Sequence, residues 1–424
     1  MTSPQADLSQ SSSNRKLILA GQIAFLPTGI LQTLLGPMLP ILIARWALND
    51  TQAGNLFLVQ FLASLAGVQL SGLLLTHWGY RPAFLRGLLL MAGGAATLLL
   101  GSPALGMAAV GAYGLGLGLL VPSDNLLIAE IGSSSSSESD AASQESSQGS
   151  SQKSSQASSQ ASSRASAVSL LNFFWSVGAV FCSLMVAWTA AHHLLPFFLG
   201  SVALFLVLLA FAMRNLPFPA AATSAESSAG SPASSSPSPS WRELAKSPAI
   251  WIFTAIFFLY PGAETAVGGW IGSYVSRLGS RGAAIASLMP AFFWTALTVG
   301  RALGTVFLRH FSERSVLRAG YGAGAAGIGL MLWAPTLTGV IGGALITGLS
   351  FATLYPITVA RLSHRFGVAA RKIGAVMFSL AAVGPAVIPW MVGVISHSTG
   401  SLRAGLLLPL GATVILFIVH LFEW

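Results

Sequence analysis

The chain has 424 residues, of which 54% are hydrophobic and only 8% are charged, and its formal net charge is +9. A soluble globular domain carries roughly 25% charged residues, so this composition excludes a water-soluble protein. The apolar residues fall into runs long enough to cross about 30 Å of hydrocarbon, for which an α-helix needs about 20 residues. The sequence therefore predicts an all-α membrane protein.

Twelve apolar segments of this kind follow one another along the chain. They cover residues 17–43, 52–76, 83–101, 104–131, 167–190, 195–213, 249–274, 283–308, 316–334, 337–361, 373–396 and 403–420. An even number of spans places both termini on one side, and most Lys and Arg residues fall on that side, which indicates the cytoplasm. The opposite side carries only Arg45, Arg277, Arg281 and Arg403. We expect a multi-pass protein of the inner (plasma) membrane with cytoplasmic N- and C-termini.

Two polar stretches separate groups of spans. Residues 132–166 are nearly all Ser, Gln and Ala, and residues 214–248 are rich in Ser, Pro and Ala. Such compositions bury too little apolar area to offset the entropy of ordering, so both stretches are predicted to be disordered. The predicted organisation is a cytoplasmic tail (1–16), a six-helix bundle (17–213) that contains the disordered loop 132–166, a disordered linker (214–248) and a second six-helix bundle (249–424).

The basic net charge does not indicate a nucleic-acid partner. The Lys and Arg residues are scattered over short loops at the ends of spans and form no basic domain. The single cysteine, Cys182, lies inside a predicted span, which excludes an intramolecular disulfide and a thiolate metal site. We therefore predict no metal and no cofactor. The expected partners are the lipid bilayer and a small-molecule solute, and the expected state is a monomer.

The two groups of six spans are related in sequence. Residues 25–29 in the first span align with residues 258–262 in the seventh, and both segments end in glycine. Further matching pairs, in the same order along both halves, are Gly114 with Gly348, Pro122 with Pro356, and Gly178 with Gly384. The order of these matches indicates a duplicated six-helix unit.

Two parallel repeats of six spans, joined by a cytoplasmic linker, resemble the major facilitator superfamily. The segment that runs from Gly72 through Thr76 and Gly79 to Arg81 resembles the superfamily's loop between its second and third spans. The resemblance implies two bundles that rock about a solute site near the bilayer midplane, with this loop as a gate on the cytoplasmic side. Thr76 departs from the pattern, because the family usually carries an aspartate there that locks the gate. The missing aspartate therefore affects how strongly the cytoplasmic gate is held closed.

Within the superfamily, the sequence is similar to the fucose-permease-like sugar transporters. Residues 260–264 read Tyr-Pro-Gly-Ala-Glu, close to that group's Tyr-Val-Gly-Ala-Glu signature, and Asn172 matches a position that is glutamine there. The resemblance implies symport of a sugar with a cation. Two acids of the group's pattern are missing, because the first span has no carboxylate and Val121 replaces the acid of the fourth span. The nearest replacement is Asp124, three residues on and roughly on the same helix face.

Two carboxylates lie well inside predicted spans, where a charged side chain costs about 2.5–3.5 kcal/mol on insertion scales. Asp124 is a candidate coupling site for a proton or a sodium ion, and its alternative role is a structural pair with a basic group such as Arg301. Glu264 is a candidate for both cation coupling and substrate binding. Pro261 and Gly262 precede it and loosen the helix, so we expect Glu264 to face a central cavity.

Neutral hydrogen-bonding side chains and aromatic rings suit a sugar, whose hydroxyl groups each need a partner in a dehydrated site. The candidate substrate-binding residues of this kind are Gln32, Gln60, Asn125, Asn172, Trp175 and Trp294. The alternative for each amide is a hydrogen bond that joins two helices, and the alternative for each ring is packing within a bundle.

These features predict a secondary active transporter for a small polar solute, such as a monosaccharide, coupled to a proton or a sodium ion. An efflux antiporter for amphipathic compounds is an alternative, but it would have few neutral hydrogen-bonding residues in its spans. A membrane sensor that does not transport is a second alternative. An enzyme is not predicted, because no cluster of His, Asp and Ser lies at one membrane face.

Overall fold

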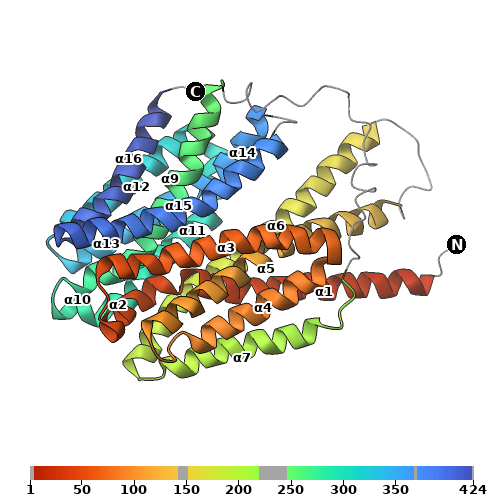
Figure 1. Ribbon diagram of the computed structural model, residues 1–424. Helices are drawn as coiled ribbons and strands as arrows, with labels where there is room; N and C mark the ends of the chain where they lie inside the picture. Colours follow the sequence, from red (N-terminus) through yellow and green to blue (C-terminus); the bar gives the residue numbers. More distant parts are fainter. Residues whose placement is uncertain (1–3, 142–150, 219–245, 367–369, 423–424) are drawn as a thin grey trace.

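The computed structural model describes residues 4–141, 151–218, 246–366 and 370–422 (Figure 1). Within these ranges all regular structure is helical, as the composition predicts. The helices form two groups that lie side by side, one from each half of the chain.

The helices of the first half follow the predicted spans one to six. They are α1 (Pro4–Thr33), α2 (Leu35–Trp46), α3 (Asp50–Trp78), α4 (Tyr80–Thr97), α5 (Pro103–Ala141), α6 (Ser151–Ala191) and α7 (Leu195–Met213). The first span is broken into α1 and α2, which are bent by 42°. The break follows from Pro37, which has no N–H to donate to the carbonyl of Thr33, the last residue of α1.

The helices of the second half follow spans seven to twelve. They are α9 (Pro248–Ser276), α10 (Ser280–Ile285), η1 (Ala286–Leu288), α11 (Met289–His310), α12 (Glu313–Trp333), α13 (Leu337–Phe351), α14 (Leu354–Phe366), α15 (Ala370–Thr399) and α16 (Leu402–Leu421). The tenth span is divided into α13 and α14. Pro356 explains the division, since it cannot bond to the carbonyl of Ala352 at the end of α13.

Length and hydropathy support most of these helices as membrane spans. Among the described residues, nine helical segments are long and apolar enough, and the bent pair α1–α2 adds a tenth if its two parts form one span. The remaining two spans of the predicted twelve are α4 and α12. Each begins with arginines, Arg81 and Arg86 in α4 and Arg314 and Arg318 in α12, which lower its mean hydropathy.

The polar stretches differ from the prediction where the structure describes them. In place of a disordered loop over 132–166, α5 continues to Ala141 and α6 begins at Ser151, while 142–150 lies outside the described residues. The tail predicted over 1–16 is likewise helical from Pro4. Adding a residue to an existing helix costs far less than starting one, so the spans extend into Ser- and Ala-rich sequence. Most of the predicted linker, 219–245, lies outside the described residues.

The two halves use the same helix pairings. Where α1 packs on α6, α9 packs on α15, and where α3 packs on α5, α11 packs on α13. The contacts of α4 with α5 and α7 recur as those of α12 with α13 and α16. Packing in space therefore repeats as the sequence does, and superposition of the two halves stays a prediction.

Repeat-related glycines lie at equivalent crossings. A methyl group at Gly178 in α6 would overlap the carbonyl oxygen of Leu26 in α1, and one at Gly384 in α15 would overlap that of Phe258 in α9. Gly29 and Gly262 take the reciprocal places on α1 and α9. Only a residue without a Cβ allows these backbones to approach so closely, so the duplicated glycines fix the crossing in each half.

The most extensive contacts between the halves join α2 with α9, α3 with α15, and α6 with α11. Figure 1 shows the halves converging where α2, α10 and the start of α3 lie, and diverging toward the N-terminal ends of α1 and α6.

We expect alanine at the crossing glycines to destabilise the protein. Gly178→Ala and Gly384→Ala overpack a filled helix contact, which costs about 1–3 kcal/mol. Gly200→Ala in α7 is the matched control, because its added methyl group would meet no atom within 4 Å. Thermal unfolding of the purified protein, followed by tryptophan fluorescence, measures the difference. Equal unfolding temperatures for Gly178→Ala and Gly200→Ala would contradict the account of the crossings.

Candidate functional site

Side chains from both halves meet where α6 packs on α11. The indole N–H of Trp175 in α6 donates to Oε1 of Gln32 in α1 over 3.1 Å. The Trp175 ring lies edge-on to that of Trp294 in α11, with the centroids 5.7 Å apart and the planes at 85°. The guanidinium of Arg301, also in α11, lies 5.3 Å from the centroid of the Trp175 ring. Trp175 therefore joins two elements of the first half to the second.

Arg301 brings a positive charge to this cluster. Its Nη1 donates to Oγ of Ser176 over 3.3 Å, and Ser176 in turn donates to the carbonyl of Asn172. Its Nε is buried and meets no acceptor among the described residues. A guanidinium carries five donors in a rigid plane, so this one has hydrogen-bonding capacity beyond the contacts with its own protein.

Trp294 lies deeper than Trp175. It is buried, its ring contacts that of Phe293 at 4.9 Å between centroids, and Gly268 of α9 packs against it. Its indole N–H finds no acceptor in the described part of the chain. In this conformation Trp294 packs within the bundle, which is the alternative role predicted for it. Its indole N–H donates no hydrogen bond among the described residues.

Glu264 belongs to a second group of contacts, on the side of α9 that faces α13. The hydroxyl of Tyr260, one turn earlier in α9, is hydrogen bonded to Oε2 of Glu264. The same hydroxyl lies 2.8 Å from the carbonyl oxygen of Phe351 at the end of α13. The charge of Arg301 acts on Glu264 and on Tyr260, so the two groups of contacts are electrostatically linked.

The contacts of Tyr260 depend on where one proton lies. A phenol has a single hydrogen, and the Phe351 carbonyl can only accept. If Tyr260 donates to Phe351, its contact with Glu264 needs a protonated carboxyl group that donates to the phenol. If Glu264 is ionised, Tyr260 donates to it and the Phe351 carbonyl loses its partner. In this arrangement Glu264 can therefore bind or release a proton while the Tyr260 hydroxyl turns from one acceptor to the other.

Asp124 lies apart from both groups. It is 0% exposed, and neither carboxylate oxygen has a hydrogen-bond partner among the described residues. The carboxylate packs against α1 at Gly21, where a methyl group would overlap its Oδ1. The alternative pairing with Arg301 is wrong, because Asp124 faces α1 whereas Arg301 contacts Ser176 and Trp175 of α6.

The amide side chains differ in what they contact. Gln60 is 1% exposed, donates to the carbonyl of Gln32 over 3.0 Å and accepts from the Tyr113 hydroxyl over 3.2 Å, so it joins α1, α3 and α5. Asn125 donates to the carbonyl of Val121 in its own helix. Asn172 is exposed on α6, one turn before Ser176. These contacts favour interhelical bonding for Gln60, while Gln32 and Asn172 border the Arg301 cluster.

The predicted gating residues form no contact between the halves in the described structure. Gly79 adopts a φ of 75° and separates α3 from α4. Thr76 is exposed, and its hydroxyl bonds to the carbonyls of Gly72 and Leu73 in its own helix. Arg81 is also exposed. Threonine at this position satisfies its hydrogen bonds locally, where a carboxylate would need a partner elsewhere.

Three residues of the site were not predicted as such from the sequence. From the sequence, Arg301 is expected only as a partner for Asp124, although a charge inside a span is itself a sign of function. Tyr260 stands out in the sequence only as part of a family motif, although its spacing of four residues from Glu264 places both on one helix face. Ser176 gives no signal in the sequence that separates it from other serines in spans.

The comparisons with known proteins agree with this fold. A relative from Saccharomyces cerevisiae, Bypass of stop codon protein 6, is 32% identical over 182 residues, which are 38% of this chain and 35% of that protein. The match thus spans about a third of that relative's length.

Solved transporters superpose over nearly the whole chain. The nucleoside transporter NupG has a TM-score of 0.70 at 14% identity, with 96% of this chain and 99% of that one covered. A D-xylose-proton symporter has a TM-score of 0.66 at 14% identity, with 94% and 96% covered. The fucose:proton symporter FucP of E. coli has a TM-score of 0.60 at 18% identity, with 97% and 99% covered. At these identities the likeness shows the fold alone.

The sequence profile described as "Major Facilitator Superfamily" matches residues 143–389, which are more than half of the chain. Together with the helical pairings and the duplicated glycine crossings, this match confirms the resemblance inferred from the repeats. The chain belongs to the major facilitator superfamily.

Proposed function

We propose that the chain is a secondary active transporter that moves a monosaccharide or a similar polyol across the inner membrane, coupled to the movement of a cation. The observation that carries the proposal is the cluster around Arg301, which joins α1 and α6 of one half to α11 of the other. A solute bound there would contact both halves, as alternating access requires.

The chemistry of the cluster suits a polyhydroxylated solute. Arg301 and the amide of Gln32 offer donors to hydroxyl oxygens, and Asn172 offers both a donor and an acceptor. The ring of Trp175 provides an apolar face of the kind that packs on the C–H surface of a sugar ring. Two of the similar solved structures carry sugars by their descriptions, a fucose:proton symporter and a D-xylose-proton symporter, which supports this solute class.

The contacts of Glu264 favour a proton as the coupling cation. The carboxyl group and Tyr260 share one or two hydrogens between them, and the charge of Arg301 lies close enough to influence which state is populated. A solute that engages Arg301 would change that influence, so solute binding and proton binding at Glu264 are coupled through Arg301. Asp124, buried without a partner among the described residues, is a second carboxylate that can take up a proton.

The proposed cycle rocks residues 17–213 against residues 249–424, with both termini in the cytoplasm. On that orientation the halves are in contact at the outer end and diverge toward the cytoplasm (Figure 1). The loop with Gly72, Thr76, Gly79 and Arg81 would close the cytoplasmic end in the opposite state. We expect a monomer to carry out this cycle.

Uptake into proteoliposomes tests the proposed function. Purified protein is reconstituted and offered a panel of labelled monosaccharides and polyols, with and without an inward gradient of protons or of sodium ions. We expect accumulation of at least one sugar under a proton gradient. If no sugar is accumulated or exchanged under any gradient, the proposal fails.

Replacing Glu264 separates coupling from transport. Glu264→Gln keeps the volume of the side chain and a hydrogen-bonding group but removes its titration. We expect gradient-driven accumulation to be lost while exchange of labelled for unlabelled sugar continues, because the halves can still rock around a bound solute. Impaired exchange would assign Glu264 to solute binding instead.

Glu313→Gln is the matched control for this variant, because Glu313 is an exposed acid at the start of α12. It should accumulate sugar like the unchanged protein. Unchanged accumulation and unchanged affinity in Glu264→Gln would contradict both roles of Glu264.

A separate prediction concerns the amide side chains of Gln32, Asn172 and Gln60. Gln32→Ala and Asn172→Ala each leave one solute hydroxyl group without a partner, which weakens binding by about 1–3 kcal/mol. Gln60→Ala instead removes two interhelical hydrogen bonds, so it should lower the unfolding temperature and leave the apparent affinity of transport nearly unchanged. If Gln60→Ala has the same affinity and the same unfolding temperature as Gln32→Ala and Asn172→Ala, this assignment is contradicted.

A further inference from the structure

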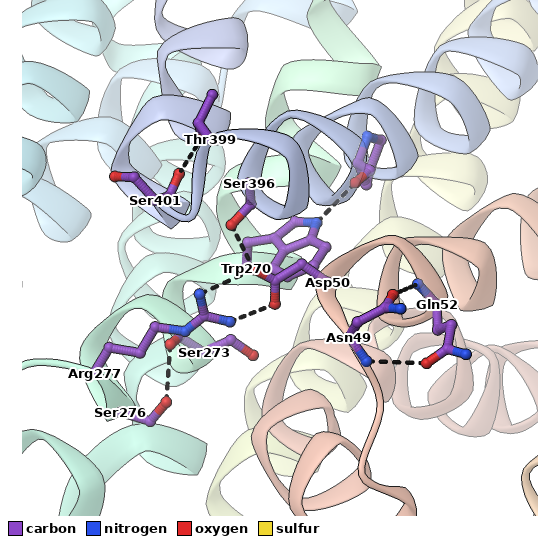
Figure 2. A network of polar contacts seen from close by, with 11 residues as sticks. Asn49, Asp50, Gln52, Trp270, Ser273, Ser276, Arg277, Ser396, Thr399 and Ser401 are labelled. Carbon is purple, nitrogen blue, oxygen red and sulfur yellow. Dashed lines mark hydrogen bonds and ion pairs between the residues drawn. The ribbon is translucent and has the colours of Figure 1, made fainter.

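A charged contact joins the halves at the end opposite to the cytoplasmic loops (Figure 2). Asp50, the first residue of α3, accepts two hydrogen bonds from the guanidinium of Arg277 at the end of α9, one of them over 3.0 Å. Ser396 of α15 donates to the same carboxylate. One residue of the first half thus binds two helices of the second half.

Both charges lie where their own helices favour them. Asp50 is at the N-terminus of α3, where the helix dipole stabilises an anion, and Arg277 caps the C-terminus of α9, where it stabilises a cation. The side chains are 13% and 39% exposed, so water can reach them. If the contact opens, neither charge is left buried without compensation. The geometry therefore allows this ion pair to form and break repeatedly.

The helices below the ion pair are packed closely. Gly393 of α15 lies against the backbone of Asp50, and Gly54 of α3 lies against the backbone of Trp390. The rings of Phe57 and Trp270 face each other with their centroids 6.1 Å apart, and Trp270 donates to the carbonyl of Pro389. This packing seals the contact between α3, α9 and α15 directly beneath Asp50 and Arg277.

The segment predicted as the cytoplasmic gate does not repeat this charged contact at Thr76. There Thr76 takes the place at which the family carries an acid, and it bonds within its own helix. The outer end thus has a charged contact between the halves at Asp50, whereas the hydroxyl of Thr76 bonds to carbonyls of its own helix.

We propose that Asp50, Arg277 and Ser396 form a reversible latch that holds the outer end of the transporter closed and biases the resting protein toward the state open to the cytoplasm. The proposal rests on the alternating access of the proposed function but on no particular solute. Breaking the latch shifts the equilibrium toward the state in which the outer end is open.

A buried serine provides a reporter for this opening. Ser273 lies on the face of α9 between Gly269, which packs on Phe57, and Arg277, since residues 269, 273 and 277 are four apart. It is buried, and its hydroxyl group has no partner among the described residues, so Ser273→Cys removes no hydrogen bond. The native Cys182 is replaced by alanine to leave this thiol alone.

The experiment measures the rate at which a fluorescent maleimide labels this thiol in protein held in nanodiscs, where both faces are accessible. Asp50→Asn and Arg277→Gln should each raise the rate, on the order of fivefold for an ion pair of this exposure. The double variant should equal the single ones, because both substitutions break the same pair. Arg281→Gln, which removes an exposed charge from α10, should leave the rate unchanged.

General loosening of the fold is detected with Cys182, which is buried in the first half and is kept in a second set of variants with Ser273 intact. Its labelling should stay at the level of the unchanged protein. The latch is refuted if Ser273→Cys labels equally fast with and without Asp50, if the two single effects multiply in the double variant, or if Cys182 also becomes reactive. Labelling requires no solute, so the latch can stand even if the sugar panel gives no uptake.

Discussion

A positive charge inside a bundle of membrane-spanning helices must find its partners within the protein, and Arg301 imposes this constraint on the centre of the molecule. The structure meets it only in part. The Trp175 ring and the Ser176 hydroxyl contact the guanidinium, while its Nε has no acceptor among the described residues. Glu264 lies near enough to act on the charge but is hydrogen bonded to Tyr260. The incomplete pairing of Arg301 is the reason for which we propose the cluster as a solute site and not only as a structural junction.

The frame around this site is held within each half by close backbone crossings. Duplicated glycines bring α1 against α6 and α9 against α15, so the helices that carry Trp175 and Glu264 are each held by a close backbone crossing. Between the halves, close backbone contacts also occur at the outer end, where Gly393 lies against Asp50 and Gly54 lies against Trp390. Arg301 and Trp175 join the halves through side-chain contacts. In the proposed cycle, rocking changes these contacts between the halves and leaves the crossings within each half in place.

Much of the fold could be predicted from the sequence, because membrane spans and the repeat leave strong signals. The pairs Gly178 with Gly384 and Gly29 with Gly262 indicated the duplication, and the structure places them at equivalent crossings. The ends of spans were less predictable. Helices α5 and α6 extend into the Ser-rich sequence that was predicted to be disordered, since composition alone does not report the helix already formed next to it.

The site was predictable only in its outline. Asp124 and Glu264 stand out because carboxylates are costly in a membrane, yet the sequence could not show that one faces α1 and the other Tyr260. Gln32 and Gln60 look alike in sequence, and only their contacts separate an amide that accepts from Trp175 from one that joins three helices. The contact of Asp50 with Arg277 connects residues far apart in the chain, and neither carries a local motif.

The most direct test of the account is equilibrium binding of sugars to purified protein in nanodiscs, followed through tryptophan fluorescence. Trp175 lies against Arg301, so a solute bound there should change the emission in a saturable way. Arg301→Lys keeps the charge but loses the planar donor group, and we expect its affinity to fall by at least about tenfold. Binding by Arg301→Lys with unchanged affinity would contradict the claim that the solute site is built around Arg301.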